Sequence, residues 1–82
     1  MKLFKISQKV NNGYDTYDSS VVCAENEEKA QYIHPGKSPE KWDGKDESFS
    51  SWCAVENVKV EYIGEAKEGT EEGVIVSSFN AG

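Results

Sequence analysis

The chain of 82 residues is 37% hydrophobic and 11% aromatic, and its nine lysines face fifteen acidic residues, giving a formal net charge of −6. It has no arginine, and a net negative charge without arginine argues against binding to a nucleic-acid backbone, whose phosphates attract cations. The aromatic content excludes a disordered chain, and the length indicates one domain over residues 1–82 with a modest core.

Two strands are predicted near the N-terminus. Residues 3–10 alternate, which places Phe4, Ile6 and Val10 on one face of a strand and lysine and serine side chains on the other. The sequence Asn-Asn-Gly follows and is typical of a turn. Residues 19–24, SSVVCA, are a second β-branched run. Strand, glycine-containing turn and strand together predict a hairpin.

The sequence period changes after the second strand and predicts a short helix. Asn26 suits the N-cap, and the two glutamates after it fall in the first turn, where the helix dipole favours negative charge. Ala30 and Ile33 share a face, and the sequence His-Pro-Gly at 34–36 stops the helix. About two turns are too few for a stable isolated helix, so we expect it to pack on a sheet.

Two further strands are predicted in the C-terminal part. Residues 56–66 alternate as a half-buried strand does, and residues 74–79, VIVSSF, form a dense apolar run after a polar, glycine-bounded turn. The side chains expected to contribute to burial are Val58, Val60, Tyr62, Val74 and Val76. The order β-β-α-loop-β-β predicts an α+β fold, a small antiparallel sheet with one short helix packed on one face.

The segments YDSSVVCAENEEKAQYIHP, VENVKVEYIGEA and GVIVSSFNAG resemble short proteins encoded by bacteriophages and prophages. The resemblance covers most of the chain except residues 37–50, and the run that ends in FNAG is its most particular part. It implies a phage-type origin. Because those proteins have no assigned activity, the resemblance brings no catalytic residue and no cofactor to this chain.

The irregular loop at residues 34–52 holds both tryptophans of the chain. Trp52 precedes an apolar run at 53–55, so we expect it to be buried. Trp42 has only polar, charged, proline and glycine neighbours. Two interpretations of Trp42 are equally favoured: exposure at a surface that binds a partner, or folding back over the core as part of a lid.

Candidate protein-binding residues are the aromatic and acidic side chains of the turns and the irregular loop. They are Trp42, Asp43, Asp46, Glu47, Tyr14 and Tyr17. Tryptophan and tyrosine are over-represented among residues that dominate interface energy, and acids speed the encounter with a basic partner. The acidic surface has a second interpretation, which is that it only keeps the protein soluble.

No catalytic, metal or cofactor site is predicted. His34, the single histidine, could act as a general base or join Cys23 and Cys53 around a metal, but a structural zinc needs four ligands. A charged histidine near a helix C-terminus also interacts favourably with the dipole, and we favour that role. The acids at 43–47 lack the spacing of a calcium loop. We expect two reduced, buried thiols, with a disulfide as the alternative if the cysteines lie on neighbouring strands.

The leading functional hypothesis is a small acidic phage-type accessory protein that binds and inhibits a host protein with a basic surface, a component of antiviral defence, without catalysis. Without an apolar signal segment or a membrane-spanning stretch, we expect it in the host cytoplasm. The alternative is a protein that binds or sequesters a nucleotide signal. Lys5, Lys9, Tyr14 and Tyr17 would then supply cations for phosphate and aromatic rings for stacking.

Overall fold

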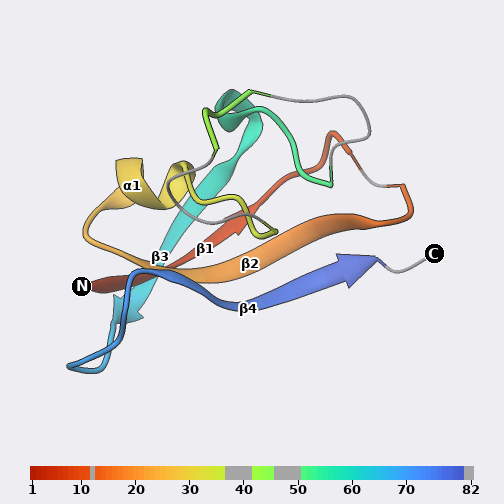
Figure 1. Ribbon diagram of the computed structural model, residues 1–82. Helices are drawn as coiled ribbons and strands as arrows, with labels where there is room; N and C mark the ends of the chain where they lie inside the picture. Colours follow the sequence, from red (N-terminus) through yellow and green to blue (C-terminus); the bar gives the residue numbers. More distant parts are fainter. Residues whose placement is uncertain (12, 37–41, 46–50, 81–82) are drawn as a thin grey trace.

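A computed structural model describes residues 1–11, 13–36, 42–45 and 51–80 of the chain (Figure 1). Its elements are the strands β1 (Lys2–Ser7) and β2 (Thr16–Ala24), the helix α1 (Glu27–Gln31), the 3₁₀ turn η2 (Val55–Asn57), and the strands β3 (Lys59–Glu65) and β4 (Gly73–Asn80). The predicted α+β fold with four antiparallel strands and one short helix is confirmed.

The four strands form one antiparallel sheet in the order β3-β1-β2-β4. β1 and β2 are the central strands, so β3 and β4 lie at opposite edges although they follow each other in the chain (Figure 1). Residues 66–72 make the connection past the ends of the central strands. The alternation of apolar residues predicted the strands, but it carries no information on their order.

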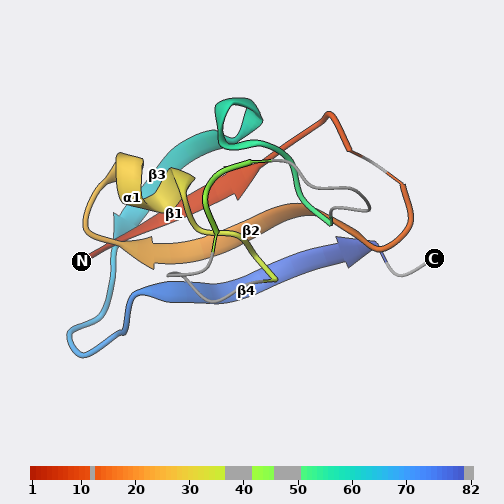
Figure 2. The same ribbon diagram turned by 45° about the horizontal axis from the view of Figure 1, so that its top comes forward.

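α1, the described segments between α1 and η2, and η2 itself cover one face of the sheet (Figure 2). The buried side chains of the core beneath them are Phe4, Ile6, Val22, Ala24, Ala30, Ile33, Trp42, Trp52, Cys53 and Val58. The predicted burial of Trp52 and Val58 is confirmed, and Ala30 and Ile33, which were expected to share a face of the helix, both belong to the core. We call this side of the sheet the covered face.

The ends of α1 follow from its sequence. The Asn26 side-chain oxygen accepts a hydrogen bond from the Lys29 backbone N–H at 2.9 Å, which confirms Asn26 as the N-cap. At the other end, the Gln31 side-chain amide donates to the Val55 carbonyl at 2.9 Å and ties the helix to η2. Among the described residues, no helix is long and apolar enough to cross a membrane.

Three predictions of burial on the strands, those for Tyr62, Val74 and Val76, are wrong, and the first strand ends earlier than predicted. Val10 is exposed because β1 ends at Ser7 and the buried Gln8 side chain then turns the chain, accepting the Val10 backbone N–H at 2.9 Å. Val74 is exposed because β4 is an edge strand at the rim of the core. Val76 is exposed because the extra residue Ile75 turns it to the uncovered face of the sheet, opposite Val21. β3 begins at Lys59, after η2, and not at residue 56 as predicted. Val60 packs against the core as predicted, but Tyr62 is half exposed because β3 is the other edge strand.

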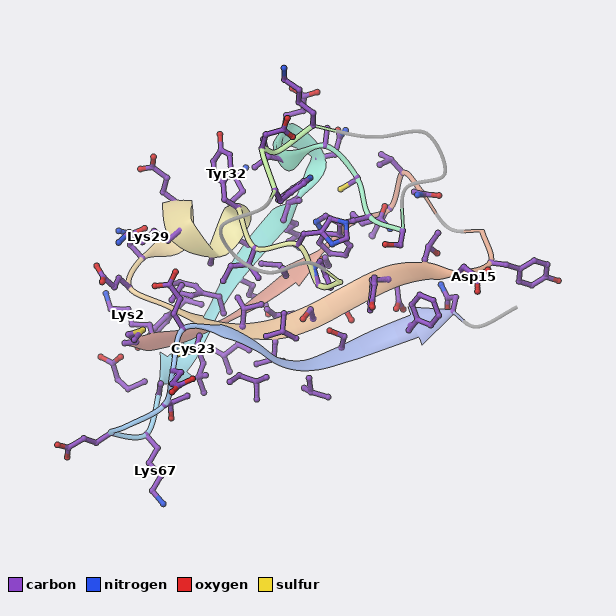
Figure 3. All side chains as sticks on the ribbon, in the orientation of Figure 1. Lys2, Asp15, Cys23, Lys29, Tyr32 and Lys67 are labelled. Atoms are coloured by element: carbon purple, nitrogen blue, oxygen red, sulfur yellow. The ribbon has the colours of Figure 1, made fainter. Side chains whose placement is uncertain are left out.

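The two cysteines lie on opposite faces of the sheet as buried thiols that no disulfide joins. Cys53 belongs to the core, whereas Cys23 alternates with the core residues of β2 and lies on the side away from α1 (Figure 3). There the Cys23 sulfur is 3.9 Å from the sulfur of Met1. The alternative of a disulfide between neighbouring strands is therefore wrong.

Candidate functional site: the β4 edge

Trp42 is a core residue and not a displayed one. Its side chain is 8% exposed, and its ring lies edge-on to His34 with 5.4 Å between the centroids, and 6.3 Å from the ring of Tyr32. The indole N–H donates to the Lys45 carbonyl at 3.1 Å. A buried tryptophan is favourable when its indole N–H makes a hydrogen bond, as it does here. Of the two interpretations of Trp42, the lid is correct and the exposed anchor is wrong.

The other predicted protein-binding residues that the structure describes, Asp43, Tyr14 and Tyr17, lie on different segments of the chain. Asp43 is exposed, but its carboxylate accepts the Lys45 backbone N–H at 3.0 Å and so stabilises a local turn. Asp46 and Glu47 lie outside the described residues. Tyr14 is 81% exposed on the connection between β1 and β2, away from the loop that carries Asp43. Tyr17 is half-buried on the covered face, where its ring centroid is 4.7 Å from that of Phe79.

Two of the residues suggested for a nucleotide, Lys5 and Tyr17, lie on different faces of the sheet. Lys5 alternates with the core residues of β1, so it lies on the uncovered face of the sheet, whereas Tyr17 is on the covered face. A hollow of about 420 Å³ beside Lys5 and Lys9 has no aromatic ring among its described lining residues. Lys5 and Tyr17 are therefore on opposite faces of the sheet.

His34 has a structural position. Its ring is 4% exposed and its Nδ1 accepts the Gly36 backbone N–H at 2.9 Å, while the rings of Trp42 and Trp52 lie against it. This arrangement holds the loop that follows α1 onto the core. In the described parts of the chain, no group of three or more His, Cys, Asp or Glu side chains is placed to hold a metal ion.

The feature that does stand out is the outer edge of β4. Four large apolar side chains of this one strand are exposed: Val74 by 39%, Ile75 by 50%, Val76 by 59% and Phe79 by 44%. On its outer side no strand of the described residues pairs with β4, so every other residue directs its backbone N–H and C=O away from the sheet. We call residues 73–80, with these side chains and this open backbone, the β4 edge.

The opposite edge of the sheet is protected, whereas the β4 edge is not. β3 carries Lys59, Glu61 and Glu65, and charges on an edge strand discourage pairing with another chain. β4 has the sequence GVIVSSFN and no charged residue. One extra residue, Ile75, bulges in the pairing with β2, but the strand continues beyond it to Asn80. The two edges of one sheet thus differ in their capacity to accept a further strand.

A groove of about 820 Å³ runs beside the N-terminal half of β4 on the covered face. The described residues that line it are Tyr17, Ile33, Pro35, Gly36, Thr70, Glu71, Glu72, Gly73, Val74 and Ile75. A chain lying along β4 could therefore place side chains into the groove, whose lining combines apolar side chains with polar groups and two glutamates. The groove and the β4 edge form one continuous surface, since Gly73, Val74 and Ile75 belong to both.

Sequence reasoning missed this surface. The absence of charge in GVIVSSFN was visible, but such a run is equally typical of a buried strand. Only the sheet order, which places β4 outside β2, shows that the apolar side chains are exposed.

Comparisons of the chain with protein-family models, with curated proteins and with solved structures found no match. The fold and the site define a small α+β domain with one protected and one open sheet edge. The functional argument therefore rests on the geometry of the β4 edge.

Proposed function

We propose that this protein is a non-catalytic protein-binding domain that adds an extended segment of a partner protein to its sheet at the β4 edge. The observation that carries the proposal is the uncharged edge strand with its four exposed apolar side chains. In strand addition, main-chain hydrogen bonds supply affinity and pockets for alternate side chains supply specificity. The backbone of β4 offers the first, and the groove beside it offers the second.

The apolar side chains make such binding energetically favourable. Complete burial of a valine, isoleucine or phenylalanine side chain contributes roughly 1.5–3 kcal/mol. The β4 side chains are already half covered, so the burial of each contributes less free energy than this. All four lie on the strand that the partner would contact. A partner segment with β-branched or aromatic residues at alternate positions would complement them.

The charge around the β4 edge selects the partner further. Glu71 and Glu72 precede the strand and line the groove, and the chain as a whole carries a formal charge of −6. A partner with basic residues beside its extended segment would associate faster and with greater preference. The resemblance to phage proteins extends the proposal to the target: a host protein, which capture at the β4 edge would inhibit, with antiviral defence as the affected system.

A matched pair of edge variants tests the proposal. Val76→Lys places a charge on the open edge, whereas Ile63→Lys places the same charge at a similarly exposed apolar position on β3. Proteins that wild type captures from host lysate would be purified, and their affinity measured for all three forms. We expect Val76→Lys to weaken binding about tenfold or more, or about 1.4 kcal/mol, and Ile63→Lys to leave it nearly unchanged. Equal affinity for all three forms would contradict the proposal.

A further inference from the structure

The C-terminal part of β4 is its most regular part. Ile75 is an extra residue in the pairing with β2, so the bulge lies in the N-terminal half of β4. At the second irregularity of this pairing the extra residue is Asp18, which belongs to β2, so β4 has no extra residue there. From Val76 to Asn80 the outer backbone of β4 therefore runs without an inserted residue, with Ser78 at its middle.

The charges next to β4 favour one orientation for pairing between two copies of this chain. Glu71 and Glu72 directly precede the strand, and the strand itself has no charge. Parallel pairing of two β4 strands would place these carboxylates side by side, and like charges opposite one another are destabilising. Antiparallel pairing places the two acidic pairs at opposite ends of the joint.

We propose that a second copy of this chain occupies the β4 edge, through antiparallel β4–β4 pairing about a two-fold axis at Ser78, and that this dimer competes with the partner protein. In this register Val76 lies opposite Asn80 of the second copy, and Ser77 lies opposite Phe79. The two Phe79 rings, each 44% exposed in the single chain, then lie diagonally on the same face, within reach of one another.

The difference between the two edges explains why the assembly closes as a dimer. Pairing of β4 with β3 of a second copy would leave one free edge at each end, and open-ended growth would follow. Lys59, Glu61 and Glu65 oppose that pairing. β4–β4 pairing uses the same strand on both copies and leaves only the charged β3 strands at the outer edges.

The dimer is expected to be weak and reversible. Stable protein interfaces bury roughly 1,200–2,000 Å² in total, and two short strands joined at their edges bury far less. Weak self-pairing would protect the open edge at high protein concentration and release it on dilution. This regulation rests on the proposed function, because the partner segment and the second copy need the same β4 backbone.

Cysteine cross-linking tests the geometry. With the axis at Ser78, the two Ser78 residues face each other directly, within the Cα separation that a disulfide requires. The exposed Ser78→Cys variant should form a covalent dimer of twice 9.1 kDa under mild oxidation. Glu61→Cys, exposed on β3, is the matched control and should remain a single chain. The native Cys23 and Cys53 are 0% and 1% exposed, so neither should contribute.

Sedimentation equilibrium tests the association itself. The mean mass of wild type should rise from one chain toward two with concentration, whereas Val76→Lys should stay at one chain with an unchanged melting temperature. A constant single-chain mass for wild type, no cross-link at Ser78, or equal cross-linking at Ser78 and Glu61 would overturn the proposal. If wild type is a monomer and Val76→Lys still weakens binding of the partner protein, the dimer proposal is wrong and the proposed function stands. If wild type forms the dimer and Val76→Lys leaves binding of the partner protein unchanged, the proposed function is wrong and the dimer proposal stands.

Discussion

At the scale of the residue, Trp42 shows why local sequence was insufficient. Its sequence neighbours are charged residues and glycine, so nothing nearby predicts burial. The rings that contact it, Tyr32 and His34, lie at the end of α1 and just beyond it, and its N–H bonds to a carbonyl three residues on. Contacts of this kind depend on how the loop folds back, which neither period nor composition encodes.

Replacement of Trp42 by alanine should therefore destabilise the fold. Truncation of a buried tryptophan typically costs about 3–5 kcal/mol, since it removes apolar contacts and leaves a cavity. Tyr14→Ala is the control, because that side chain is 81% exposed and surface changes usually stay within about 0.5 kcal/mol. Urea unfolding of both variants measures the difference. If Trp42→Ala were as stable as Tyr14→Ala, the ring would not belong to the core.

At the scale of the element, the sequence predicted the strands and the helix, because their alternation, N-cap and turn residues are local signals. The strand order β3-β1-β2-β4 depends on contacts between residues far apart in the sequence, so local signals did not predict it. For the same reason they did not predict which strands lie at the edges of the sheet. VIVSSF was expected to bury Val74 and Val76, but its position outside β2 exposes Val74, and the extra residue Ile75 turns Val76 to the uncovered face. The sequence therefore did not predict the candidate site, because local patterns do not show which strand lies at the edge of the sheet.

The loop at residues 42–45 can be tested as a packed element through two glycines. Gly44 and Gly69 both have positive φ, +84° and +90°, so alanine strains the backbone at either position. A Cβ at Gly44 would also lie 2.9 Å from Tyr32 and 3.0 Å from Val55, whereas none of the described atoms lies within 4 Å at Gly69.

Gly44→Ala should therefore lower the melting temperature more than Gly69→Ala does. The difference between the two variants reports the close packing of the loop against Tyr32 and η2, because the backbone strain is common to both. Thermal unfolding by circular dichroism gives both values. Equal losses would show that the loop is not packed as described.

At the scale of the whole molecule, the net charge of −6 should control how fast a basic partner associates. Neutralising Glu71 and Glu72 together, as glutamines, should slow association and reduce its dependence on salt, with a smaller effect on dissociation. Glu27→Gln with Glu28→Gln removes the same charge from α1 and is the control. Rates from stopped-flow mixing with the purified partner compare the two double variants. Identical rates would mean that charge next to β4 has no special role.

The central claim is that the sheet accepts a further strand at β4 and not at β3, and amide hydrogen exchange tests it most directly. The probe is a synthetic peptide with the sequence of residues 73–80 and a lysine added at each end. Its binding should slow exchange at alternate amides of β4, those that point away from β2, and leave β3 unchanged. Slower exchange along β3, or no change in β4 at saturating peptide, would contradict the account.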